Sequence, residues 1–186
     1  MIIPVSGHDP SLTHWGTAEG MLCLDTGILT NVTVGMAITA KGKNKQVRAN
    51  SDDLRRAEDL AEHAFAVGRR SRVSFGEFPV GSKSANAMKS CGVAFGIGAS
   101  MRANGIIVIE VTAKASKKVM TGDPEASKAK MIAAAMELYP DAGWKYHHGK
   151  LTNDNEHMAD AIAAIHAGVI TPEFQNLMGL LQKVTS

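Results

Sequence analysis

Residues 27–40, Gly-Ile-Leu-Thr-Asn-Val-Thr-Val-Gly-Met-Ala-Ile-Thr-Ala, carry the clearest strand pattern of the chain. From Val32 to Ile38 the apolar residues alternate with polar or small ones, which is typical of a half-buried strand. Two more apolar segments come before, Ile2–Gly7 and His14–Leu24, and the turn Asp25-Thr26-Gly27 separates the second of them from residues 27–40. This opening therefore predicts an antiparallel meander of three strands.

Helices and strands alternate after the meander. Asn50-Ser51-Asp52-Asp53 offers a helix cap, the apolar residues that follow have helical spacing, and Gly68 ends that helix. Ser71–Phe78 and the almost wholly apolar Ile106–Val111 are predicted strands, the second of them central in its sheet. The remaining segments predict a buried helix at Ser84–Arg102, a basic loop at Lys114–Pro124, helices at Asp123–Leu138, Asp154–Ala167 and Pro172–Lys183, and a loop at Pro140–Asn153.

This order of elements predicts one α/β domain that spans residues 1–186, with 172–183 as a short C-terminal helix. Three antiparallel strands followed by two parallel strands would form a five-stranded mixed sheet, with helices on both of its faces. Such an arrangement is typical of the RNase H-like fold.

The charged residues are grouped by sign, although the net charge is only +2. Basic clusters lie at Lys41–Arg48, Arg69–Arg72, Lys114–Lys118 and Lys128–Lys130, and acidic clusters lie at Asp52–Asp59 and Asp154–Asp160. Basic patches around an acidic centre suit an enzyme that grips phosphates and holds cations, but solvated loops and helix faces explain the charges equally well.

The two cysteines, Cys23 and Cys91, match no zinc-binding spacing. We expect both to be buried thiols in a reducing cytoplasm. No apolar stretch approaches the ~20 residues of a membrane-spanning helix.

Two acidic residues stand at the ends of predicted strands. Asp9 follows the first strand in Gly7-His8-Asp9-Pro10-Ser11, and Glu77 ends the fourth. A carboxylate at a strand end is held rigidly, as a metal ligand should be. Taken singly, however, each has a simpler explanation, since Asp9 could cap a turn beside Pro10 and Glu77 could be an exposed strand-end residue.

The helix predicted at Asp154–Ala167 adds two further candidate ligands. His157 and Asp160 are three residues apart and share one helix face. The helix dipole accounts for Asp154 and Glu156 in the first turn, but less well for Asp160 one turn later. Carboxylates from three separate elements could hold two Mg²⁺ or Mn²⁺ ions for phosphodiester hydrolysis, and His157 would suit Mn²⁺ or transfer a proton.

Several short motifs resemble, in order, those of the RuvC-type Holliday-junction resolvases. Gly7-His8-Asp9-Pro10-Ser11 is similar to that family's G-[IL]-D-P-G start, and His157-Met158-Ala159-Asp160-Ala161 is similar to its final [DH]-x-x-D-A motif. Between these two motifs, further short segments resemble motifs of the family, so that the resemblance spans nearly the whole chain. These segments are Asn86–Lys89, Cys91–Ala94, Lys117–Gly122 and Ala126–Lys130.

The resemblance implies a homodimeric endonuclease that nicks four-way DNA junctions symmetrically. By motif, the metal ligands would be Asp9, Glu77, His157 and Asp160. Lys117 would contact the scissile phosphate region, and Lys128 would contact DNA or stabilise the acids. The DNA-binding residues implied are Lys114, Lys117, Lys118, Lys128 and Phe78, the last as an aromatic wedge at the junction centre, although core packing is an equal explanation for Phe78.

The chain departs from the family pattern at several places. His8 replaces an apolar residue beside Asp9, and the segment after Glu77 is shortened, which leaves Glu110 as an alternative acid. Residues 144–153 are longer than expected, and their His147-His148 pair could contact DNA or simply be exposed. The helix Ser84–Arg102, rich in small residues, is either the dimer contact or an internal helix.

Three other functions are compatible with this sequence. Another RNase H-like nuclease, acting on hybrids, flaps or forks, would need the same acids. A non-catalytic junction-binding protein would keep the fold without the cleavage. A phosphotransferase of the related actin-like fold ranks last, because the chain lacks the duplicated domain and the second phosphate loop.

Overall fold

A five-stranded mixed sheet forms the centre of the computed structural model, which describes residues 1–43, 48–79, 81 and 84–185. Its strands are β1 (Ile2–Pro10), β2 (His14–Cys23), β3 (Leu29–Ile38), β4 (Val73–Glu77) and β5 (Val108–Val111), in the spatial order β3-β2-β1-β4-β5. The pairs β1–β2 and β2–β3 are antiparallel, whereas β1–β4 and β4–β5 are parallel. The predicted sheet, with three antiparallel strands followed by two parallel strands, is therefore confirmed.

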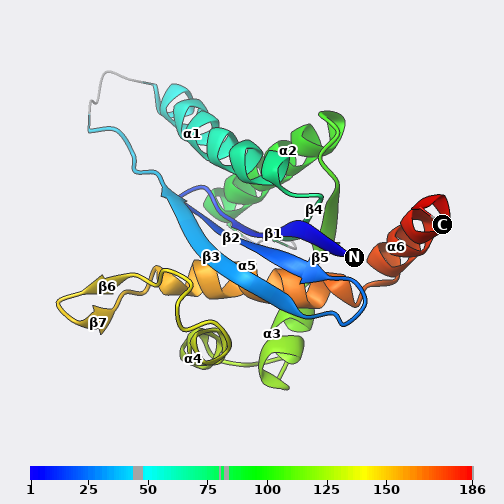
Figure 1. Ribbon diagram of the computed structural model, residues 1–186. Helices are drawn as coiled ribbons and strands as arrows, with labels where there is room; N and C mark the ends of the chain where they lie inside the picture. Colours follow the sequence, from blue (N-terminus) through cyan, green and yellow to red (C-terminus); the bar gives the residue numbers. More distant parts are fainter. Residues whose placement is uncertain (44–47, 80, 82–83, 186) are drawn as a thin grey trace.

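Helices cover both faces of this sheet (Figure 1). α1 (Ala49–Arg70) and α2 (Ala85–Ala103) pack together on one face, and α5 (Asn155–Val169) lies across β1, β2 and β4 on the other. α3 (Ala113–Thr121) and α4 (Lys128–Leu138) pack against α5, and α6 (Pro172–Thr185) follows it. None of the helices in the described ranges combines the length and apolar character that a bilayer span requires.

Four predictions about local structure were wrong. The basic segment Lys114–Pro124 is mostly helix α3, because Thr112 caps it, Ser116 and Met120 face the interior, and Gly122 ends it with φ 75°. The helix predicted to begin at Asp123 starts only at Lys128, after the cap Ser127. The helix predicted to be capped at Asn50–Asp53 and to end at Gly68 is α1, which begins already at Ala49, where the N-cap residue Arg48 makes no side-chain hydrogen bond, and continues to Arg70. Cys23 is half-buried, although Cys91 is buried as expected.

The predicted loop Pro140–Asn153 contains a small hairpin, β6 (Tyr146–His147) and β7 (Lys150–Leu151). In the basic cluster Lys41–Arg48, residues 44–47 lie outside the described residues, as does Ser186 at the end of the predicted domain.

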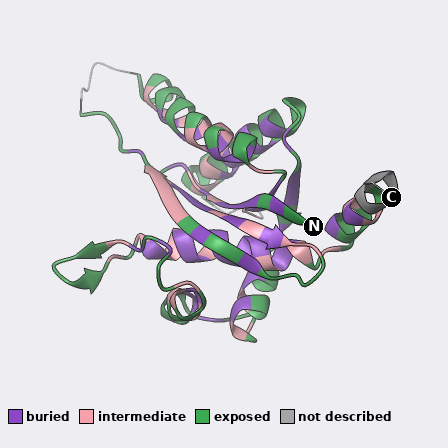
Figure 2. Ribbon diagram, in the orientation of Figure 1, coloured by how far each residue is buried: buried purple, intermediate pink, exposed green. Residues whose placement is uncertain are grey.

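Among the described residues, α5 is the most buried of the helices, as its colouring in Figure 2 shows. It can lie close to the sheet because two strand residues facing it are glycines. A Cβ atom on Gly7 would lie 1.8 Å from the carbonyl oxygen of Ala161, and one on Gly16 would lie 2.3 Å from that of His157. Any side chain at these positions would push α5 away from β1 and β2.

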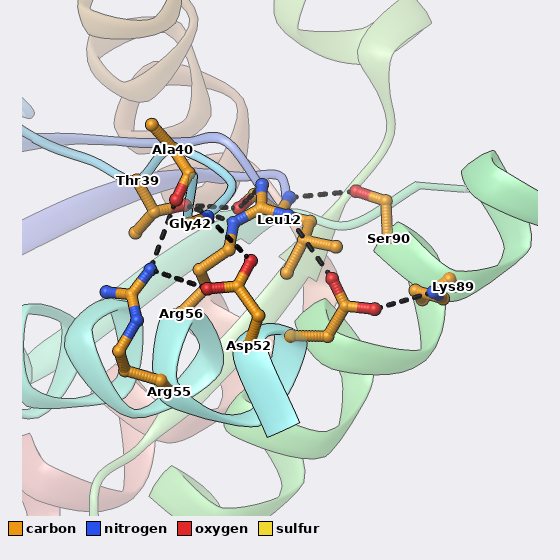
Figure 3. Close-up of polar contacts among 10 residues, drawn as sticks. Leu12, Thr39, Ala40, Gly42, Asp52, Arg55, Arg56, Lys89 and Ser90 are labelled. Atoms are coloured by element: carbon orange, nitrogen blue, oxygen red, sulfur yellow. Dashed lines mark hydrogen bonds and ion pairs between the residues drawn. The ribbon is translucent and has the colours of Figure 1, made fainter. Parts of the chain in front are cut away.

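A buried arginine secures the β1–β2 turn, directly after Asp9 and Pro10 (Figure 3). The Arg56 side chain in α1 is 2% exposed and donates to the carbonyl oxygen of Leu12 (3.0 Å) and to Thr39 Oγ1 (3.2 Å). Its charge is met by Asp53 at 3.3 Å. The Leu12 amide donates to Ser90 Oγ of α2 at 2.9 Å, so that both helices hold this turn.

The close contact at Gly7 leads to a stability prediction. We expect Gly7→Ala to lower the free energy of unfolding by about 3 kcal/mol or more, because overpacking against backbone cannot be relieved by a side-chain rotation. Gly179→Ala is the matched control, since a Cβ there meets nothing within 4 Å in mid-helix, and it should leave stability unchanged or slightly raised. Urea denaturation checks both, and equal stability of the two variants would contradict the close-packing argument.

Candidate functional site

Asp9 and Glu77 lie at the carboxyl ends of two neighbouring parallel strands. The last pair in register between β1 and β4 is His8 with Gly76, so each acid follows directly after it. Gly7 and Phe75, two residues earlier, both contact α5. Because side chains alternate along a strand, Asp9 and Glu77 are on the face that α5 covers.

Helix α5 brings His157 to Asp9 in its first turn. The His157 Nδ1–H group donates to Asp9 Oδ2 at 2.6 Å. This hydrogen bond, more than the charges of Asp9, Glu156 and Asp160 around it, raises the pKa of His157 and so favours its protonated form.

The ionised forms of the two other acids of the site, Asp160 and Glu77, are destabilised. Burial raises the pKa of Asp160 to about 8, and the charges of Asp9, Glu77 and Glu156 add to this effect. Burial, followed by the charge of Asp9, raises the pKa of Glu77 to about 7. The carboxyl groups of Asp9, Glu77 and Asp160 therefore repel one another, because the site contains too little positive charge to balance them.

Ser116 lies beside Glu77 in the first turn of α3. Its buried hydroxyl lowers the pKa of Glu77, yet Ser116 Oγ has no partner at hydrogen-bond geometry among the described residues. The hydroxyl therefore lies near Glu77 but is unsatisfied. A buried polar group without a partner at an acidic centre suits a site that receives a ligand.

Two of the predicted lysines border the acids. Lys128 Nζ lies 2.5 Å from Glu156 Oε1, and this contact, followed by the charges of Asp160 and Asp9, raises the pKa of Lys128. The charge of Lys117, a half-buried residue of α3, lowers the pKa of Glu77.

The other predicted residues lie further out or on the opposite face. Lys114 forms an exposed pair with Glu125 at 3.1 Å, and Lys118 is exposed. Phe78 is half-buried on the α2 side of the sheet, where it contacts Gly98 and stacks on Phe95 with ring centroids 6.1 Å apart. The alternative acid Glu110 also points to that side and pairs with Arg102 at 3.0 Å, which leaves Glu77 as the acid of this strand edge.

His14 was missed by sequence reasoning. Its ring, from the start of β2, stacks on His157 with centroids 4.9 Å apart and planes at 12°, and its Nε2 lies 4.0 Å from Asp154 Oδ1. Burial, followed by the charge of His157, lowers the pKa of His14. No local signal marks His14, because the contact depends on β2 pairing and on the approach of α5.

His8, which replaces an apolar residue of the family motif beside Asp9, lies on the face of the sheet opposite to α5. Burial lowers its pKa to about 3, so the ring is neutral. The Trp15 indole donates to His8 Nδ1 at 3.1 Å, which leaves the His8 proton on Nε2, 3.1 Å from Ser6 Oγ. Ser6 Oγ in turn lies 2.9 Å from Ser74 Oγ, so that this buried chain joins β2, β1 and β4.

Within the described ranges, no three His, Cys, Asp or Glu side chains converge closely enough to ligate a single ion as they stand. The site is instead a set of oxygen donors from β1, β4 and α5 around a common edge of the sheet, with one histidine among them.

Solved structures share this fold. The RuvC protein of Thermus thermophilus in complex with a Holliday junction substrate is similar with a TM-score of 0.62 and 18% identity, over 95% of this chain and 96% of that chain. A further structure of Thermus thermophilus RuvC is similar with a TM-score of 0.62 and 19% identity, over 96% and 97%. No family model and no curated protein matches the chain. The chain therefore has the RNase H-like fold in its RuvC form.

The raised pKa of Asp160 predicts a pH-dependent stability in chelator-treated protein. The unfolded chain releases this proton near its ordinary value of 3.8, whereas the folded protein keeps it until about pH 8, so stability falls as pH rises between these values. Asp160→Asn removes this loss of stability because asparagine does not ionise. We therefore expect the variant to raise the Tm by about 3 °C or more at pH 8 and by clearly less at pH 5. The exposed Asp141→Asn is the control, and an equal Tm shift at both pH values would contradict the assignment.

Proposed function

We propose that this protein is a metal-dependent nuclease that cleaves branched DNA, with the four-way junction as its substrate. The observation that carries the proposal is the gathering of Asp9, Glu77 and Asp160, with His157, from three separate elements onto one edge of the sheet. The fold supports it, because a protein of this fold has been solved with a Holliday junction.

The donor set fits Mg²⁺ or Mn²⁺. Burial and mutual repulsion make Glu77 and Asp160 hold protons that a divalent cation would displace, and carboxylate oxygens are the ligands that such hard cations prefer. Asp9, Glu77 and Asp160 would hold the ions, and His157 would border them. The chemistry such ions supply is activation of water and stabilisation of charge on the oxygens of the scissile phosphate.

The residues of the chain have distinct roles in this proposal. His157 holds a proton at Nδ1 against Asp9 Oδ2 and thereby fixes the orientation of that carboxylate. Lys128 neutralises Glu156, and Lys117 offsets the charge of Glu77 and would bind the phosphate region. Lys114 and Lys118 on the exposed side of α3 would add phosphate contacts that do not read sequence.

Junction selectivity would come from a homodimer, since two active sites can then meet two strands. The outer face of α2 is the proposed contact, because Gly92, Phe95, Gly96 and Ala99 are exposed along it. Phe78 stacks on Phe95 from the sheet side and would lie beside that contact, where it could reach the junction centre.

Metal binding predicts a thermal shift. At pH 8, millimolar Mg²⁺ or Mn²⁺ should raise the Tm of the wild-type protein by about 3 °C, because a ligand that binds only the folded state stabilises it. The double variant Asp9→Asn/Asp160→Asn should lose this shift, whereas Asp141→Asn should keep it. Equal shifts in all three proteins would place the ions elsewhere.

Cleavage of labelled four-way junction, duplex, flap and RNA–DNA hybrid tests the reaction itself. Paired symmetric nicks in the junction alone are expected, and Asp9→Asn or Glu77→Gln should each slow them by about 100-fold or more. The matched control is Glu110→Gln, which changes an acid on the opposite face and should leave the rate near that of the wild type. Equal cleavage of plain duplex would rule out a resolvase, and cleavage of the hybrid alone would favour another RNase H-like nuclease.

A further inference from the structure

The β6–β7 hairpin is a protruding element without a buried residue. It extends past the α5 N-terminus in Figure 1, and all residues from Tyr146 to Leu151 are exposed (Figure 2). Ordering a segment costs conformational entropy, which burial normally offsets. Since no residue of the hairpin is buried, burial alone gives little reason for its defined shape.

The hairpin has a defined geometry. His148 and Gly149 form its two-residue loop, and both have positive φ, 47° and 73°, as a type I′ turn requires. Tyr146 pairs with Leu151, and His147 pairs with Lys150. Paired residues point to the same side of a ribbon, so one side presents Tyr146 and Leu151 while the other presents His147 and Lys150.

Its base is fixed to the helix that carries the candidate ligands. Asn155 is fully buried two residues before His157; its Oδ1 accepts from the Lys145 amide at 2.9 Å, and its Nδ2 donates to the Lys145 carbonyl at 2.8 Å and the Thr152 carbonyl at 3.0 Å. One buried side chain thus holds both ends of the hairpin. The arm therefore has a set position relative to the first turn of α5.

The chemistry of the arm suits a polyanion with flat bases. Residues 142–153 contain Lys145, Lys150 and three exposed aromatic or imidazole rings, at Tyr146, His147 and His148, beside the buried Trp144, and no acid. Lysines bind phosphates, and exposed rings stack on bases without reading their sequence. A protein partner of ordinary surface composition would not require this absence of acids.

We propose that the β6–β7 hairpin is a nucleic-acid-binding arm that holds the DNA strand beside the cleavage site, with Lys150 on its phosphates along one side of the ribbon and Tyr146 stacked on a base at the other side. This inference rests on the proposed function for its substrate. The arm acts in binding and takes no part in the hydrolytic step.

The test compares Tyr146→Ala/Lys150→Ala with the matched control Ile28→Ala/Arg72→Ala. The control also removes one exposed apolar side chain and one exposed cation, but from the other end of the sheet, near the start of β1 and β4. Fluorescence anisotropy with a labelled four-way junction in EDTA gives the Kd and its salt dependence without cleavage. Both variants should keep the wild-type Tm, since only exposed side chains change.

We expect the hairpin variant to bind about ten-fold more weakly and its salt slope to fall by about one, whereas the control stays within about two-fold of the wild type. If the hairpin variant has the Kd and the salt slope of the wild type, the proposed binding role of the hairpin is overturned. If the wild type cleaves the junction in the same experiment, the proposed nuclease function still stands. Weaker binding by the hairpin variant together with no cleavage in Mg²⁺ or Mn²⁺ would uphold the arm and overturn the nuclease. A wild type that binds no DNA would overturn both.

Discussion

The contact between helix α5 and the sheet is the constraint on which the site depends. Gly7 and Gly16 leave space for the backbone of α5 at Ala161 and His157, so the helix lies against β1 and β2 without intervening side chains. Only at this separation does His157 reach Asp9 at 2.6 Å. The same helix is the most buried of the described helices, so the site is built on a rigid part of the fold.

That rigidity has an electrostatic cost. Apolar packing of α5 draws Asp160 into the interior, where burial and the charges of Asp9 and Glu77 oppose its ionisation. His157 and Lys128 compensate only part of this charge, since Lys128 is paired first with Glu156. Folding thus stabilises an arrangement that is unfavourable by itself, and the remaining negative charge favours cations at this edge.

Sequence reasoning predicted what depends on local pattern and missed what depends on long-range contact. Alternation from Val32 to Ile38 predicted β3, and apolar runs ending in acids predicted Asp9 and Glu77 at strand ends. The prediction of a loop at Lys114–Pro124 was wrong, because the many lysines of this segment lie on the exposed side of a helix that has one buried face. The stacking of His14 on His157 has no local pattern at all, since strand pairing and α5 packing create it.

His8 and Asp9 show how far strand geometry separates neighbouring residues. His8 faces α1 and α2, where burial keeps its ring neutral and Trp15 and Ser6 satisfy both of its nitrogens. Asp9 faces α5 and meets His157. The imidazole that departs from the resolvase pattern therefore adds no charge to the acidic site. It is a core residue that ties β1 to β2 and, through Ser6 and Ser74, to β4, and so aligns the two strands whose ends carry Asp9 and Glu77.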